Sequence, residues 1–181
     1  MTVVTWRAGI MCCDSCWTFG GTQVASLIKI HRLASGALIG QAGDNDCRNM
    51  MTLFDRIKDP SKFPTKQELA STKDNFMGLL ALPKGGVYVI ASCPVDEAGW
   101  PVADSYDERE EVGIWPATSM GGYASIGSGS DLALAAMDAG ANARQAVEIA
   151  CRRNINCRLP IHAVPLHVKK VQGNVNRKIS R

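Results

Sequence analysis

The second residue of the sequence is a threonine, and its position suits it to nucleophilic catalysis. Removal of Met1 would leave Thr2 with a free α-amino group beside its hydroxyl. A threonine hydroxyl is a weak nucleophile that needs an adjacent base, and an N-terminal amine with a reference pKa of about 7.7 to 8.0 can act as that base near neutral pH. Because a threonine after the initiator methionine is also an ordinary start, the interpretation depends on which other residues reach Thr2.

Three residues further along the chain have the chemistry to support such a nucleophile. Asp14 ends a β-prone run, where a carboxylate is otherwise a common turn residue. Lys29 lies in an alternating segment, and an inward-facing cation there needs a partner, for which Asp14 is the natural choice. A buried ammonium close to Thr2 would lower the pKa of the amine and of the hydroxyl. Gly43, between a predicted strand and a predicted helix, has a backbone N–H that can face a developing oxyanion.

The first quarter of the chain is predicted to form consecutive β-strands that position these residues. Thr2 to Trp6 and Ile10 to Asp14 form a predicted hairpin at the start of the sequence. In the next predicted strand, Gln23 to Ile30, alternation puts Lys29 on the face opposite the neighbouring isoleucines. A fourth strand is predicted over Ala37 to Ala42.

The rest of the chain combines capped helices with further β-prone runs. Helices are predicted from a cap at Asp44 to Ile57, after the capping box Thr65–Glu68, over Asp131 to Ala139, and after the capping box Asn142–Gln145. Strands are predicted at Tyr123 to Ile126, in a hairpin of Met77 to Leu82 with Val87 to Ser92, and at an edge strand, Leu159 to Val168. The long segment Cys93 to Met120, interrupted by prolines, is predicted to be a surface excursion or lid. Two sheets with a helix pair on each outer face would bury these apolar surfaces, which predicts an α+β fold.

Length and composition agree with one compact domain. The 181 residues are 46% hydrophobic and 20% charged, enough for a layered core. We place this domain at residues 1–168 and treat residues 169–181 as a basic C-terminal tail, more typical of a solvated end than of a nucleic-acid site. No apolar run is long enough for a membrane helix, and the first residues lack the pattern of a secretory signal, so the cytoplasm is the expected compartment.

The cysteines favour a reduced protein without a metal. Seven is an odd number, and Cys12 and Cys13 are adjacent, so a disulfide framework is a poor interpretation. Cys13 and Cys16 form a C-x-x-C, which can mark a metal or redox site, but no second C-x-x-C and no histidine-rich partner accompany it. We therefore predict no metal and no cofactor.

Taken together, the motifs resemble a known family. The order Thr2, Asp14, Lys29, Gly43 and then Ser-Ile-Gly-Ser-Gly-Ser at residues 125–130 resembles that of proteasome β subunits and the bacterial HslV peptidase. The resemblance is closer still to short proteasome-like proteins of bacteriophages and bacteria, which begin with the pattern Met-Thr-x-x-x-aromatic-Arg-x-Gly-x-Met-x-x-Asp-Ser. Residues 2–15, 22–43 and 125–154 carry the likeness, whereas residues 60–120 do not.

The resemblance implies a role for each matching residue. Thr2 would be the nucleophile with its own amine as base, and Lys29, held by Asp14, its electrostatic partner. The Gly43 N–H would bind the oxyanion, and Ser128 would hydrogen-bond near the amine. Where the family usually has an aspartate and then a serine, this chain has Asn154 and Cys157. Asn154 keeps a hydrogen-bonding side chain but has no negative charge to support the amine.

The resemblance also implies a fold and an activity. The fold would be a four-layer αββα sandwich of the N-terminal-nucleophile hydrolases, with two antiparallel sheets between helix pairs. The activity would be that of a threonine peptidase, assembled as a homo-oligomeric ring that acts on peptides or unfolded polypeptides, in several members delivered by a ring ATPase. Leu27 and Gln41 match positions of the substrate-specificity pocket. The alternative is a catalytically silent structural or assembly subunit of the same fold that keeps Met1.

Overall fold

Two antiparallel sheets form the centre of the computed structural model, which describes residues 2–19, 22–43, 48–72, 75–92, 112–117 and 121–167. The first sheet has the order β10 (Tyr123–Ile126), β1 (Val4–Arg7), β2 (Ile10–Cys13) and β11 (His162–Pro165). The second has the order β5 (Ile30–Arg32), β6 (Leu38–Gly43), β7 (Phe76–Leu82), β8 (Gly86–Ser92) and β9 (Gly113–Pro116). A separate ribbon pairs β3 (Cys16–Phe19) with β4 (Thr22–Ser26).

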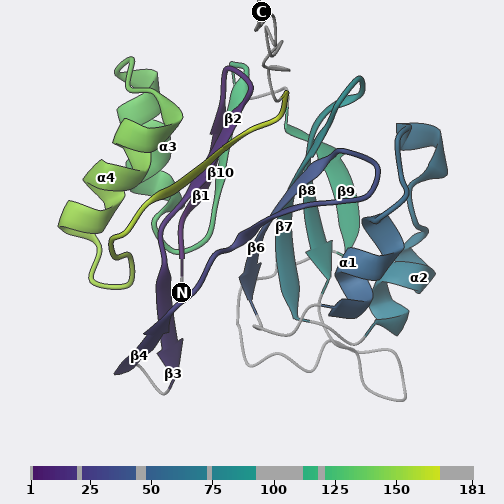
Figure 1. The fold of residues 1–181 in the computed structure, drawn as a ribbon, viewed down its shortest axis with the longest axis horizontal. Coiled ribbons are helices and arrows are strands. Elements are labelled where there is room, and N and C mark those ends of the chain that lie inside the picture. Colours follow the sequence, from purple (N-terminus) through teal and green to yellow (C-terminus); the bar gives the residue numbers. More distant parts are fainter. Residues whose placement is uncertain are drawn as a thin grey trace, which may run out of the picture.

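Helices cover the outer face of each sheet (Figure 1). The four-stranded sheet packs against α3 (Ser130–Asp138) and α4 (Ala143–Arg153), and the five-stranded sheet against α1 (Arg48–Phe54) and α2 (Lys66–Ser71), with a short 3₁₀ helix at Pro60–Lys62. Three clusters of buried apolar side chains fill the spaces between these layers. This arrangement confirms the predicted α+β sandwich with the layer order αββα.

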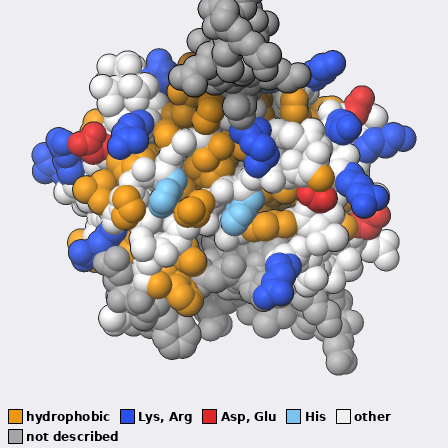
Figure 2. All heavy atoms as spheres, viewed as in Figure 1, with side chains coloured by type: hydrophobic (Ala, Val, Ile, Leu, Met, Phe, Trp, Pro, Cys, Tyr) orange, Lys and Arg blue, Asp and Glu red, His pale blue; other side chains and the backbone are white. Residues whose placement is uncertain are grey.

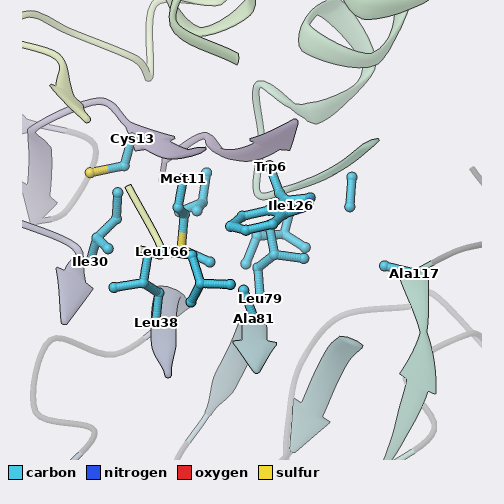
Figure 3. Close-up of a cluster of buried hydrophobic side chains, with 12 residues drawn as sticks. Trp6, Met11, Cys13, Ile30, Leu38, Leu79, Ala81, Ala117, Ile126 and Leu166 are labelled. Atoms are coloured by element: carbon cyan, nitrogen blue, oxygen red, sulfur yellow. The ribbon is translucent and has the colours of Figure 1, made fainter. Parts of the chain in front are cut away.

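The core between the sheets follows from the period-two alternation of their strands. Val4 and Met11 face the opposite sheet, whereas their neighbours Val3 and Cys12 face α3 and α4. Figure 3 shows Trp6, Met11 and Ile126 of one sheet directed toward Leu79 and Ala81 of the other. The alternation therefore divides the apolar residues of β1 and β2 between two separate cores.

The predicted helix starts are confirmed where the cap residues are described. The Asn142 side chain accepts a hydrogen bond from the Gln145 backbone and the Gln145 side chain accepts one from the Asn142 backbone, closing a capping box at α4. Thr65 and Glu68 form the same reciprocal pair at α2. The predicted cap at Asp44 lies outside the described residues, and α1 is observed from Arg48.

The predicted strand Gln23 to Ile30 is wrong in its second half. β4 ends at Ser26 and β5 begins at Ile30, so residues 27–29 belong to no strand. Ile28 is 57% exposed while Ile30 is 5% exposed, so the two do not share a buried face. The reason is that this segment crosses from the β3–β4 ribbon to the large sheet, and its backbone bonds to residues of both regions. β3 itself was not predicted.

The segment Cys93 to Met120 is also different from its prediction where it is described. Gly113–Pro116 forms β9, which pairs with β8 at the edge of the five-stranded sheet. Residues 93–111 and 118–120 lie outside the described residues, as does the predicted tail 169–181. The C-terminal edge strand is confirmed as β11, although it is shorter than predicted.

Among the described helices, none is both long enough and apolar enough to cross a bilayer. On the face shown in Figure 2, the lysine and arginine side chains of the described residues are spread among hydrophobic and neutral ones instead of forming one stripe. Nucleic-acid-binding surfaces usually gather basic residues along one face or one helix, and this face has no such pattern among its described residues.

A change at Gly40 tests the close approach of the two sheets. A β-carbon at Gly40 would lie 2.4 Å from Val4 Cγ1 and 2.9 Å from Met11 Sδ, too close for these two side chains to keep their positions. We expect Gly40→Ala to lower the free energy of unfolding by about 1–3 kcal/mol through overpacking. Urea denaturation measures the loss. In a Val4→Ala background, which creates the missing space, the same change should cost less, and an equal cost in both backgrounds would contradict the packing argument.

Candidate active site

The carboxylate of Asp14 is the centre of a buried polar cluster. Asp14 is 0% exposed, and it accepts hydrogen bonds on both oxygens. Oδ1 accepts from the Thr2 hydroxyl at 2.6 Å, the Val3 backbone at 3.0 Å and Lys29 Nζ at 2.8 Å. Oδ2 accepts from the backbone N–H groups of Cys16 at 2.9 Å and Arg158 at 3.1 Å. Five donors from distant parts of the chain therefore satisfy one buried charge.

Lys29 joins this carboxylate to the Thr2 hydroxyl. Its ammonium donates to Asp14 Oδ1 and also to Thr2 Oγ1, which in turn donates its own proton to Asp14. Lys29 is 6% exposed and Thr2 is 2% exposed, so water screens these charges little. The structure thus brings together the three residues in which the sequence predicted the nucleophile and its ionic support.

The backbone of Thr2 is held by the segment between β10 and α3. The Thr2 N–H donates to Ser128 Oγ at 3.2 Å, and the Thr2 carbonyl accepts from the Gly129 N–H at 3.2 Å. Gly127 has a positive φ of 90°, and a β-carbon on it would lie 2.4 Å from the Thr2 carbonyl oxygen. A glycine is therefore required at residue 127 both by its conformation and by the close approach of Thr2.

Asn154 contacts this segment from the end of α4. Its Nδ2 donates to the Ser128 carbonyl at 2.6 Å, and its Oδ1 accepts from the Asn156 backbone at 2.8 Å. Asn154 is thus linked to Thr2 through Ser128. No hydrogen bond joins Asn154 directly to Thr2 among those seen in the described residues. The predicted proximity of Ser128 and Asn154 to the Thr2 nitrogen is observed as this short chain of hydrogen bonds.

Thr2 opens onto a cleft of about 490 Å³ at one end of the space between the sheets. Gly43, at the end of β6, lines this cleft together with Thr2 and Ser128, as predicted for residues that share a site. Gly43 has a φ of 108°, and a β-carbon there would lie 2.2 Å from the Asn75 carbonyl oxygen, so only glycine fits.

Leu27 and Gln41 are not among the described residues that line this cleft. Ala42, the neighbour of Gln41, packs in the core between the sheets, so alternation turns the Gln41 side chain toward the helical side of β6. The Gln41 amide oxygen is buried and has no hydrogen-bond partner among the described residues. Their role in substrate binding stays a prediction that this geometry does not support.

Several contributors to the site were not predicted. The N–H groups of Cys16 and Arg158 bind Asp14, but a backbone donor has no residue-type signal in a sequence. Met77, Val89 and Ala91 line the cleft and come from the β7–β8 hairpin. That hairpin lies in the part of the chain that carries no family resemblance. Side chains alternate between the two faces of each strand in this hairpin. Assigning one face to the opposite sheet would have predicted that these three side chains point toward the cleft.

Solved structures with a similar fold cover most of this chain. They include Thiobacillus denitrificans BPH in complex with epoxomicin, with 16% identity, a TM-score of 0.57, and coverage of 92% of this chain and 99% of that one. Eukaryotic HslV from Trypanosoma brucei has 19% identity and a TM-score of 0.54, covering 91% of this chain and 98% of that one. The Gly-1 mutant of Anbu from Hyphomicrobium sp. strain MC1 has 13% identity and a TM-score of 0.60, covering 91% and 81%.

The chain has the proteasome-like N-terminal-nucleophile hydrolase fold. No family model matches the sequence, and no curated protein sequence matches it. At 13–19% identity the structural likeness establishes the proteasome-like fold, and the site must be argued from its own geometry.

Cys157, one of the two departures from the family pattern, is a packing residue in this proteasome-like fold. It is 2% exposed, and a β-carbon on Gly129 would lie 2.7 Å from its sulfur. Burial raises the pKa of the Cys157 thiol to about 12, so it stays protonated near neutral pH. A neutral thiol here fills space beside the segment that holds Thr2.

The other described cysteines near the site have the same character. Burial raises the pKa of Cys12 and of Cys13 to about 11 and that of Cys151 to about 12. Cys12, Cys13, Cys16, Cys151 and Cys157 are all free thiols. Within residues 2–19, 22–43, 48–72, 75–92, 112–117 and 121–167, no group of three or more His, Cys, Asp or Glu side chains is arranged to hold a metal ion.

The buried ion pair predicts a large loss of stability when one partner is removed. Lys29→Met leaves the Asp14 carboxylate without its countercharge, and we expect a cost of about 3–5 kcal/mol in the free energy of unfolding. Lys29→Met combined with Asp14→Asn should cost less than the sum of the two single changes. Chemical denaturation of all three variants measures this coupling.

The matched control is the exposed ion pair between Arg152 and Glu148 on α4, at 2.6 Å. Arg152→Met should cost less than about 1 kcal/mol, because solvent screens an exposed pair. A Lys29→Met variant that is no less stable than Arg152→Met would show that the buried pair does not support the fold.

The raised thiol pKa values predict slow alkylation. At pH 8, below the raised pKa values of about 11 to 12, Cys12, Cys13, Cys151 and Cys157 should remain unmodified by iodoacetamide in the folded protein. Unfolding in guanidinium returns their pKa to the ordinary range and should make all four reactive. Peptide mapping by mass spectrometry reads each site separately. Rapid modification of any of the four in the folded state would contradict its assignment as a packing residue.

Proposed function

We propose that this chain is a threonine-type peptidase in which cleavage of the Met1–Thr2 bond makes Thr2 the N-terminal nucleophile. The observation that carries the proposal is the buried contact of Lys29 Nζ with Thr2 Oγ1, at a residue that opens onto a cleft. A buried ammonium that donates to a hydroxyl oxygen favours the negative charge that this oxygen gains as it attacks. The resemblance of the sequence and the proteasome-like fold agree with this role.

The proposed reaction uses only groups of this chain and water. The Thr2 hydroxyl gives its proton to the new α-amine as Oγ1 bonds to the substrate carbonyl carbon. The oxyanion that forms accepts a hydrogen bond from the Gly43 N–H. The amine then returns the proton to the leaving nitrogen, the C–N bond breaks, and an ester on Thr2 remains. Water, losing a proton to the same amine, hydrolyses the ester, and the proton returns to Oγ1.

Two further residues are proposed to position the amine. Ser128 Oγ lies 3.2 Å from the Thr2 nitrogen, within hydrogen-bond reach of an amine at the same place. Asn154 holds the Ser128 carbonyl and thereby fixes the segment that carries this hydroxyl. Because Asn154 has no charge, it orients Ser128 without the electrostatic support to the protonated amine that a carboxylate gives.

The assembly and partners are proposed from the family resemblance. We propose that the chain forms a homo-oligomeric ring and acts on peptides or unfolded polypeptides, with a ring ATPase as a candidate partner. The second candidate function is a catalytically silent subunit of the same fold. The observation that favours it is Asn154, which contacts Ser128 at the residue where the resembled family has an aspartate. A neutral side chain there gives no charge support to a protonated amine at Thr2.

The state of the N-terminus and its reactivity test the proposal together. Intact-mass measurement should show that Met1 is absent from the purified protein, and epoxomicin, the compound present in the Thiobacillus denitrificans complex, should add to Thr2. Thr2→Ala should lose the adduct and lower peptide hydrolysis at least about a thousandfold, since both the nucleophile and its hydroxyl proton are gone.

Thr2→Ser is the matched control, because it keeps the hydroxyl and the amine and should retain measurable hydrolysis. The threonine mechanism would be refuted if the protein kept Met1 under all conditions. It would also be refuted if the Thr2→Ala variant cleaved peptides as well as the unchanged protein does. The first of these results would favour the silent subunit.

A further inference from the structure

The core between the two sheets is filled at its centre but open at the end where Thr2 lies. Ala42, Met77 and Ala91 are direct neighbours across β6, β7 and β8, according to the strand register. All three are partly buried and line the cleft beside Thr2. Because Ala42 and Met77 pack against the core between the sheets, alternation turns this row of side chains toward the opposite sheet.

The next row along the same strands is closed over β6 and β7. It consists of Gly40, Leu79 and Val89, again direct neighbours in register. Leu79 is fully buried, and Val4 of the opposite sheet occupies the space above Gly40 so closely that no β-carbon would fit there. The sheets are thus in contact over Gly40 and Leu79, whereas Val89 is partly buried and still lines the cleft. In the row nearer to Thr2, the small side chains of Ala42 and Ala91 lie on either side of Met77. The two sheets are not in full contact at this row, and a slot lies between them.

The described residues that line this slot give it apolar walls and a rim of uncharged polar side chains. Ile126 of β10 lies on the other side of the slot from the row of Ala42, Met77 and Ala91, and the hydroxyl-bearing residues Ser128 and Ser130 line the rim. None of the described residues that line the cleft is charged. Among these residues a charged side chain entering the slot would find no countercharge to offset its lost hydration, whereas an apolar side chain would gain buried contact area.

We propose that the slot between Ile126 and the row Ala42–Met77–Ala91 binds an uncharged, apolar side chain of the substrate next to the bond that Thr2 attacks. The inference rests on the proposed function for the position of that bond, and it adds the class of residue that the enzyme selects. The two alanines set the width of the slot, and Met77 forms its adaptable floor. Leucine-sized side chains fit this description better than acidic or basic ones.

Binding to a protein that cannot cleave tests the slot separately from catalysis. In the Thr2→Ala background, dansylated peptides Ala-Ala-X-Ala-Ala with X as Leu, Asp or Lys are titrated by fluorescence anisotropy. We expect the leucine peptide to bind at least about tenfold more tightly than the charged ones, the usual range for discrimination by an apolar pocket. Ala91→Leu fills the slot and should lower the affinity for the leucine peptide about tenfold, with a smaller effect on a peptide with X as Ala.

Two further variants guard against a trivial loss of folding. Ala135→Leu, at an exposed position of α3, makes the same chemical change away from the cleft and should leave binding unchanged. Met77→Ala widens the slot instead of filling it and should shift the preference from leucine toward phenylalanine. Equal affinity for the leucine, aspartate and lysine peptides, or a leucine preference unaffected by both Ala91→Leu and Met77→Ala, would overturn the proposal.

The two proposals fail in different ways. If epoxomicin does not label Thr2 and no peptide is cleaved, but the leucine preference and its loss in Ala91→Leu are observed, the slot stands and the threonine mechanism fails. If Thr2 is labelled and peptides are cleaved without regard to the residue X, the mechanism stands and the slot is overturned.

Discussion

One buried carboxylate organises the region around Thr2. Removing a charge from water costs several kcal/mol, and the cost is offset only when every lone pair of the group finds a donor. Asp14 meets this condition with donors from Thr2, Val3, Cys16, Lys29 and Arg158. These residues belong to the start of β1, the start of β3, the entry to β5 and the approach to β11. All four segments must therefore be in place before the charge is stabilised.

This constraint explains the irregular path of the chain between the two sheets. To bring Lys29 to Asp14, residues 27–29 leave the β3–β4 ribbon and do not continue as a strand. The Leu27 N–H bonds to the Ser15 carbonyl and the Lys29 carbonyl accepts from the Gln41 N–H, so each end of the crossing is fixed to a different element. Because residues 27–29 run between the β3–β4 ribbon and the five-stranded sheet, neither of them buries the side chain of Ile28, which is exposed. Local rules of alternation fail here because the ion pair outweighs them.

Features that depend on residues close together in the sequence were predicted correctly, whereas several features that depend on contacts between distant residues were missed. The capping boxes at Thr65 and Asn142 and the β7–β8 hairpin depend on residues a few positions apart, and they were predicted at the right places. The pairing of Asp14 with Lys29 was predicted because a buried cation needs a partner. Their convergence on Thr2 was predicted from the family resemblance. In contrast, the break after Ser26, the pairing of β9 with β8 and the backbone donors to Asp14 depend on long-range geometry. Residue types alone carry no signal for these features.

The open end of the core and the placement of Thr2 have a common cause. Thr2 continues the side of β1 that faces the opposite sheet, since Val4 and Trp6 lie on that side two and four residues later. A fully packed core at this row would cover the Thr2 hydroxyl with side chains from β6, β7 and β8. The alanines at residues 42 and 91 avoid this, at the expense of apolar contact that a larger pair would supply. The fold thus leaves its own core incomplete beside Thr2, and under the proposed function the missing contacts are those that a bound apolar side chain would restore.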